Sequence, residues 1–214
     1  MTKLNLSRPP RLPSAPTQYD KQFHDQHSDV LRLYFSQLDN VSASLIGPNG
    51  GVFIQSPHAM LMSDQDQANA GVTSENIVTY NVPVIEQGIE VRSGSEIWFE
   101  QTGQYFISFS LQFTNRGNAA QEIEVWAKSD GSNYPLSNTR FDIAARKSVS
   151  VWSHAVAAVT GIFTVTNPDT NYLRIAWWSD GPDVFAESYP AGTAPVRPAV
   201  PSVILTANLI SRLP

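Results

Sequence analysis

The sequence predicts a mostly β protein in which a β-sandwich follows an extended N-terminal arm and a short amphipathic helix. Residues 104–114 alternate apolar and polar side chains with a period of two, the pattern of a half-buried strand. From residue 52 onward, short runs of strand-forming residues are separated by Gly, Pro, Asn and Asp. Before that point, a proline-rich segment leads into a stretch with helical periodicity. We therefore expect one helix, followed by a domain built from β-strands.

Residues 1–19 are predicted to form an extended anchoring arm. Prolines at positions 9, 10, 13 and 16 fix φ and remove backbone donors, which excludes a helix or a central strand. Apolar side chains alternate with cations, and this favours a tether that becomes ordered against a neighbouring subunit. A disordered tail is the alternative. The docking residues of the arm are Leu4, Leu6, Arg8, Arg11 and Leu12.

Residues 20–46 are predicted to form a trimerising amphipathic helix, capped by Asp20 and uninterrupted by Pro or Gly until Gly47. Apolar residues recur at spacings of three and four, the a/d pattern of a coiled coil. An independent coiled coil needs about three to four heptads, so the following domain is expected to assist trimerisation. An ordinary amphipathic helix packed on its own sandwich is the alternative. The seam consists of Leu31, Tyr34, Leu38 and Val41.

The same heptad frame places His24 and His27 at a and d positions. In a parallel trimer, such histidines form rings of three imidazoles on the axis, which can hold a metal or an anion. A polar layer that sets the register of the helices is the alternative, and it is favoured. No metal site and no cofactor is therefore predicted.

Residues 47–51 are predicted to be a Gly/Pro hinge, and residues 52–214 a sandwich or jelly roll. The runs 95–100 and 104–114 flank Gln-Thr-Gly, which predicts a central hairpin that reverses at Gly103. Further strands are predicted at residues 52–55, 76–80, 88–92, 122–128, 148–156, 161–166, 171–178, 184–189 and 202–210.

Two features of these strands suggest contacts beyond the core. Residues 202–210 are partly apolar on both faces, which predicts a central strand, a strand buried by a neighbouring subunit, or both. In residues 171–178, alternation directs Trp177 and Trp178 to opposite faces. Because both indoles cannot enter one core, Trp178 is the candidate for an intersubunit or surface contact.

Composition narrows the function classes. Charged residues make up 15% of the chain, against about 25% in ordinary soluble domains, and the net charge is −5. This favours a surface covered by neighbours in an oligomer, with a surface rich in uncharged polar residues as the alternative. The acidic balance argues against nucleic-acid binding, and no apolar run reaches the roughly 18 residues of a membrane span. Without cysteines or a recognised catalytic motif, an enzyme is not expected.

The pattern Ile-x-Phe-x-x-x-Gly-x-Tyr-x-Ile-x-Phe-Ser at residues 97–110 resembles the central hairpin of C1q/TNF-like jelly rolls. It is most similar to the version found in virion proteins of tailed bacteriophages. Residues 123–131, 135–140 and 191–206 carry further motifs in the same order, so the resemblance covers residues 50–214. It implies a jelly roll that trimerises and has a structural or adhesive role on a virion, on the head or on the tail.

From this resemblance we expect a non-enzymatic virion structural protein, a homotrimeric capsid decoration or fibre protein. It would be made in the host cytoplasm, displayed on the particle exterior, and docked through its N-terminus to other virion proteins of the capsid or tail. The alternative is a receptor-binding tail fibre or adhesin whose jelly roll binds a host-surface glycan.

Overall fold

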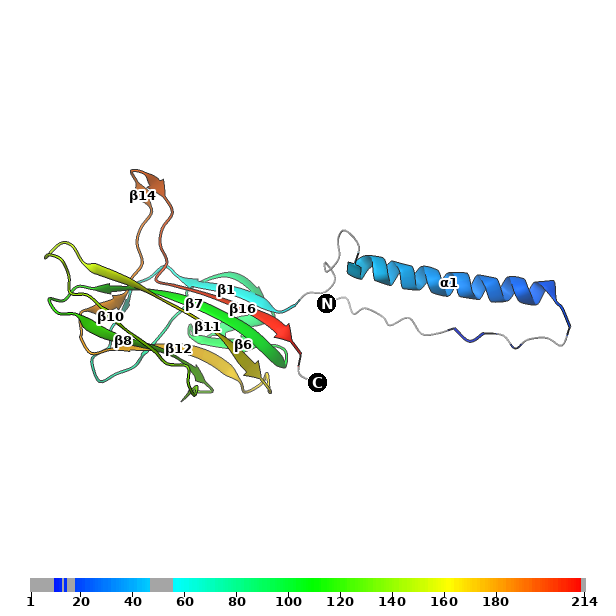
Figure 1. The fold of residues 1–214 in the computed structure, drawn as a ribbon, viewed down its shortest axis with the longest axis horizontal. Helices are drawn as coiled ribbons and strands as arrows, with labels where there is room; N and C mark the ends of the chain where they lie inside the picture. Colours follow the sequence, from blue (N-terminus) through cyan, green and yellow to red (C-terminus); the bar gives the residue numbers. More distant parts are fainter. Residues whose placement is uncertain (1–9, 13, 15–17, 47–55, 213–214) are drawn as a thin grey trace. The chain divides into compact units, whose positions relative to one another are not determined.

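The computed structural model describes residues 10–12, 14, 18–46 and 56–212. The chain divides into two compact units, Met1–Gln55 and Ser56–Pro214. The first unit contains helix α1 (Lys21–Ile46), and the second contains antiparallel β-sheets (Figure 1). The prediction of a mostly β fold with one helix is confirmed for the described residues. The predicted hinge and the predicted strand at 52–55 lie outside them.

Helix α1 begins where the sequence predicts, because Asp20 caps it. The backbone N–H of Gln22 donates to Asp20 Oδ1 at 2.9 Å, and the N–H of His24 donates to the Asp20 carbonyl at 3.2 Å. The carboxylate thus satisfies an amide that has no partner inside the helix.

Two seven-stranded antiparallel sheets make up most of the second unit. Sheet A consists of β1 (His58–Ser63), β2 (Gln67–Ala68), β4 (Val82–Gln87), β7 (Gly103–Asn115), β11 (Ser153–Val165), β13 (Val184–Ala186) and β16 (Val203–Ser211). Sheet B consists of β3 (Asn76–Ile77), β5 (Ile89–Arg92), β6 (Glu96–Phe99), β8 (Gln121–Ser129), β9 (Ser132–Asn133), β10 (Thr139–Ile143) and β12 (Tyr172–Ser179). A separate hairpin pairs β14 (Gly192–Thr193) with β15 (Val196–Arg197).

The inner faces of the two sheets pack on one hydrophobic core, the arrangement of a β-sandwich. Phe113 of β7 lies edge-on to Trp177 of β12, with ring centroids 5.2 Å apart. As predicted, one face of β7 is buried and β16 is a central strand, between β7 and β1. The buried apolar side chains of β7 are Tyr105, Ile107, Phe109, Leu111 and Phe113.

The predicted central hairpin is wrong. The chain after β6 crosses from sheet B to sheet A, so β6 and β7 do not pair. Phe99 and Tyr105 instead face each other across the core, with ring centroids 4.5 Å apart. Alternation identifies a buried face but does not tell a paired strand from one across a sandwich. Gly103 is required by close packing, since a Cβ there would lie 2.4 Å from Leu209 Cδ1.

Other strand boundaries also differ from prediction. The strands predicted at 148–156 and 161–166 form one strand, β11, which runs through Gly161. Strands β1, β4 and β10 were not predicted, nor were the two-residue strands β2, β9, β14 and β15. Strand β4 escaped notice because it contains Pro83, which a strand tolerates at the edge of a sheet.

Candidate functional site: an uncharged sheet face

The outer face of sheet A is unusual within the described chain because its outward side chains carry no charge across five adjacent strands. Strands β4, β1, β16, β7 and β11 lie side by side, and their outward side chains form three rows across the sheet. The rows are Ile162, Phe106, Asn208, His58 and Gln87; then Thr160, Ser108, Thr206, Met60 and Ile85; then Ala158, Ser110, Ile204, Met62 and Val82. We call these positions the uncharged face.

None of these described positions holds Asp, Glu, Lys or Arg, with histidine counted as neutral at pH 7. Three large apolar side chains on the face are solvent-exposed in the single chain: Phe106 at 40%, Ile85 at 44% and Ile162 at 56%. Five strands about 4.8 Å apart, each contributing about 20 Å, give a flat area of roughly 480 Å². Patches of roughly this size on a monomer are often functional, so the face is a candidate interaction surface.

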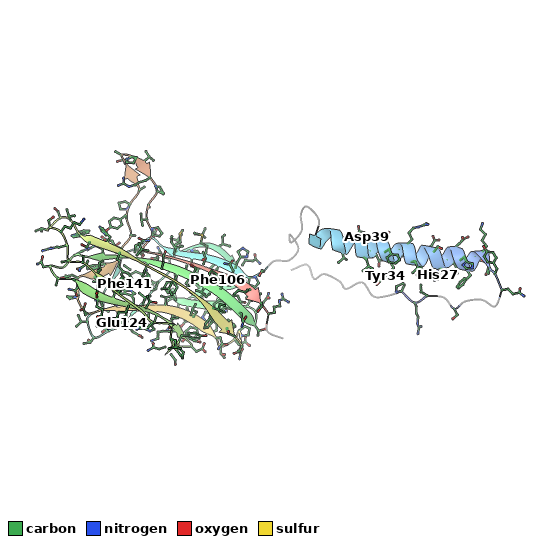
Figure 2. The ribbon with its side chains drawn as sticks, in the orientation of Figure 1. His27, Tyr34, Asp39, Phe106, Glu124 and Phe141 are labelled. Carbon is green, nitrogen blue, oxygen red and sulfur yellow. The ribbon has the colours of Figure 1, made fainter. Side chains whose placement is uncertain are left out.

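The outer face of sheet B is charged and internally paired. Glu96 of β6 accepts a hydrogen bond from Arg174 of β12, and Glu122 of β8 accepts one from Arg140 of β10. The Nζ of Lys128 lies 2.5 and 2.7 Å from the two carboxylate oxygens of Glu75. Phe106 and Glu124, labelled in Figure 2, come from the outward positions of β7 and β8 and represent the two faces.

A polar cluster closes one end of the uncharged face. Tyr189 Oη donates to Glu187 Oε2 at 2.6 Å and lies 3.2 Å from both Thr114 Oγ1 and His154 Nδ1. Glu187 also accepts from Arg116 Nη2 at 2.6 Å. Burial, and secondly the hydrogen bond to Glu187, raise the pKa of Tyr189 to about 12. His154 is thus a strand residue whose Nδ1 lies within hydrogen-bond distance of Thr114 Oγ1 and Tyr189 Oη.

Aromatic rings enclose the cation of this cluster. The guanidinium carbon of Arg116 lies 4.4 Å from the ring centroid of Trp152 and 4.2 Å from that of Phe185. Asp66 Oδ2 lies 3.6 Å from Arg116 Nη2. The charges here are therefore paired and rigidly held, and the network fixes the chain around Tyr189.

Helix α1 has an apolar stripe on one side. From residue 21 to 41, the half-buried side chains are Phe23, His27, Val30, Leu31, Tyr34, Leu38 and Val41, and the others are exposed. All four residues of the predicted seam therefore lie in one stripe. The charged side chains Asp25, Asp29, Arg32 and Asp39 lie outside it.

The two histidines that the heptad frame places at a and d positions have different surroundings. His27, labelled in Figure 2 together with Tyr34, is half-buried and stacks with Phe23 at 6.0 Å between centroids. His24 is exposed and stacks on Tyr19 at 5.1 Å. Among the described residues, no three His, Asp or Glu side chains are grouped so as to hold a metal ion.

Trp178 and the N-terminal arm complete the predicted site residues. Trp178 lies half-buried on the outer face of sheet B, where its Nε1 donates to the Val72 carbonyl at 2.6 Å. Arg11 and Leu12 are exposed, with Leu12 at 48%, and have no regular secondary structure. The other three predicted arm residues, Leu4, Leu6 and Arg8, lie outside the described residues.

The sequence prediction missed the uncharged face, because its five strands are distant in sequence. A signal for it exists in the sequence. The alternate residues that face outward hold only apolar or neutral polar side chains, at positions 104–114 of β7, 154–164 of β11 and 204–208 of β16. The polar cluster around Glu187 has no comparable signal.

Comparison with family models and with curated sequences found no relative of this chain. No model of a known protein family matches this chain, and no curated protein sequence matches it. No helix in the described part of the chain is long and apolar enough to cross a membrane.

Proposed function

We propose that this protein is a non-enzymatic structural subunit that assembles as a homotrimer, in which copies pack against one another through the uncharged face. The observation that supports the trimer is the absence of ionised side chains at the outward positions of five adjacent strands in sheet A. Covering such a face removes apolar area from water and requires no ion to be desolvated. The paired charges on sheet B suit a face that stays in water.

The stripe on α1 supports the same assembly. Apolar side chains widen the a/d seam, and the charged side chains of α1 lie outside the stripe. A wide stripe is better covered by two neighbouring helices than by one, which is the geometry of a parallel trimer. The two surfaces, one in each unit of the chain, would then be buried in one assembly.

The particular architecture we propose is a C1q/TNF-like jelly roll carried on a phage virion. The strand order supports it, because the first and last long strands, β1 and β16, pair in one sheet and the chain crosses repeatedly from one sheet to the other, as between β4 and β5, β6 and β7, β7 and β8, and β11 and β12. The motifs at residues 97–110, 123–131, 135–140 and 191–206 support the virion role. The protein would be a capsid decoration or fibre displayed on the particle exterior.

The trimer can be tested with one charge placed on each sheet. Ser108 lies in the middle row of the uncharged face, and Ser132 is exposed on β9 of sheet B. Light scattering coupled to size exclusion should give a trimer mass for the wild type and for Ser132→Arg, and a monomer mass for Ser108→Arg. A monomeric wild-type protein at micromolar concentration would refute the trimer.

Docking through the N-terminal arm is the second part of the proposal. Prolines lower the entropy that the arm loses when it becomes ordered on the virion, and its leucines and arginines suit an apolar groove with acidic rims. Deleting residues 1–19 should abolish co-sedimentation with particles that lack the wild-type protein and leave the trimer intact. Undiminished binding would place the docking surface elsewhere.

One observation favours the alternative of an adhesin. Aromatic side chains line the outer face of sheet B, and host glycans stack on aromatic rings; the half-buried ones are Trp98, Trp126, Tyr172 and Trp178. Against it, the indole N–H groups of Trp98, Trp126 and Trp178 already donate within the chain. A glycan-array signal that Trp126→Ala abolishes would establish the adhesin, and an empty array would remove this support.

A further inference from the structure

The hairpin that carries β14 and β15 projects from the sandwich (Figure 1). Its root is a bridge in which Tyr189 and Val200 exchange backbone hydrogen bonds of 2.8 and 2.9 Å. Beyond the root, the side chains at its tip lie in solvent, and Val196 is 89% exposed. A two-stranded hairpin without a core of its own is marginal in water, so its extended form requires an explanation.

The root of the hairpin is held firmly. Tyr189 belongs to the polar cluster and donates to Glu187, which is 4% exposed. At the tip, the side chain of Arg197 lies over Gly192, where a Cβ would approach Arg197 Cγ to 2.6 Å. From Tyr189 to Thr193, four residues at about 3.3 Å each extend the tip roughly 13 Å past the root. Packed sheets lie about 10 Å apart, so the tip can reach a molecule packed against sheet A.

A groove of about 560 Å³ lies between the root of the hairpin and the uncharged face. Val200 and Pro201 line its hairpin side, and Met62, Val82 and Ile204 of the uncharged face line the other. Asp64 lies at the groove and is exposed. The groove is therefore mainly apolar, with one carboxylate.

We infer that the tip of this hairpin docks in the corresponding groove of a neighbouring copy of the chain, with Val196 in the apolar part and Arg197 beside Asp64. The inference rests on the proposed trimer. The tip supplies an apolar side chain and a cation, and the groove supplies an apolar wall and an anion. Within the described residues, neither Arg197 nor Asp64 has an ion-pair partner.

The symmetry of a ring supports a second copy as the occupant. In a cyclic trimer each interface joins two different surfaces, so a projecting element on one copy can enter a groove on the next. The groove also borders the face that the trimer is proposed to cover, which places the tip and the groove at the same interface.

Engineered thiols test this contact directly, because the chain contains no cysteine. The double variant Val196→Cys with Met62→Cys should give covalent dimers and trimers after mild oxidation on a non-reducing gel. The matched control, Val196→Cys with Val72→Cys, places the second thiol on the loop over Trp178 of sheet B and should give none. A double variant that is trimeric by light scattering but forms no cross-link, or cross-links only within one chain, overturns the hairpin contact and leaves the trimer standing. A monomer overturns both.

A charge exchange provides a second readout. Arg197→Glu should raise the dissociation constant of the trimer about 10-fold, and adding Asp64→Arg should restore it to within about 3-fold. Both residues are exposed, and Asp64 Oδ1 accepts one hydrogen bond within the chain, from Asn81 Nδ2. An unchanged dissociation constant for Arg197→Glu would contradict the proposed pairing.

Discussion

The two outer faces of the sandwich are built from the same kind of strands and use opposite chemistry. Sheet A presents neutral and apolar side chains in register across five strands, whereas sheet B presents carboxylates and cations that pair with one another. Surface ion pairs contribute little stability, but they keep a face hydrated and costly to cover. A face without ionised side chains can be covered by another molecule without this desolvation cost. The difference supports the proposal that the sheet A side of the sandwich meets other copies of the chain and the sheet B side stays in water.

The largest expected effect is the weakening of the trimer by a carboxylate on the uncharged face, compared with a carboxylate on the sheet B side. Phe106 on the uncharged face and Val72 on the sheet B side are 40% and 43% exposed, so their replacement by Asp is matched for exposure. Phe106→Asp should raise the dissociation constant of the trimer roughly 100-fold or more, because it buries charges without partners. Val72→Asp should change it less than about 3-fold. Sedimentation equilibrium measures both constants, and equal effects of the two variants would erase the proposed distinction between the faces.

On sheet B, the ion pair between Lys128 and Glu75 should affect stability rather than assembly. Glu75→Gln leaves an ammonium group unpaired in a side chain that is 10% exposed, which should cost about 2 kcal/mol of unfolding free energy. Lys128→Met should cost less than about 1 kcal/mol, because Glu75 is 42% exposed and water can replace the ammonium. Urea titration followed by tryptophan fluorescence compares the two. A larger loss of unfolding free energy for Lys128→Met than for Glu75→Gln would mean that burial of the lysine does not determine the cost of breaking the pair.

Alkaline pH tests the border of the uncharged face. The pKa of Tyr189 is raised from 10.0 to about 12, so between these values the unfolded chain loses the phenolic proton while the folded chain keeps it. The folded state then binds more protons than the unfolded state, and stability falls as pH rises from 10 to 12. Tyr189→Phe should be less stable at pH 8 by about 1 kcal/mol, because the hydrogen bond to Glu187 is lost. The Tyr189→Phe variant should also lose less unfolding free energy between pH 8 and pH 11 than the wild type, as measured by urea titration at both pH values. An equal loss in the two proteins would show that Tyr189 does not titrate as described.

Local patterns predicted much of the architecture. Alternation identified the buried face of β7, and Asp20 together with the three-four spacing placed the start and the stripe of α1. Each of these features depends on residues close together in the sequence.

Features that depend on distant strands were not predicted. Pairing of β7 with β11 and β16 assembles the uncharged face from segments about 50 and 100 residues away, and no local period specifies that register. For the same reason β6 and β7 were wrongly paired, since both have one apolar face and lie next to each other in sequence. The network of Arg116, Glu187 and Tyr189 exists only after β13 joins the end of β7.

The smallest expected effect concerns Leu136, an apolar side chain outside the uncharged face. It is fully exposed, and its φ of 60° lies in the left-handed region, where a side chain such as leucine is strained. Pro135 precedes it, and the Ser137 N–H donates to the Tyr134 carbonyl at 3.4 Å, so Leu136 occupies the third position of a β-turn. With Pro at the second position and positive φ at the third, this is the pattern of a type II turn, which favours Gly or Asn there.

Leu136→Asn should therefore raise the unfolding free energy by about 1 kcal/mol and leave the trimer mass unchanged. Leu136→Ala is the control, because alanine removes the same apolar surface and keeps the strain of positive φ. Only the Asn variant should gain stability in a urea titration. If both variants instead dissociate the trimer, Leu136 makes an intersubunit contact. The interface would then extend past β11 at the edge of sheet A, and the strain at Leu136 would serve to expose an apolar side chain to a neighbouring copy.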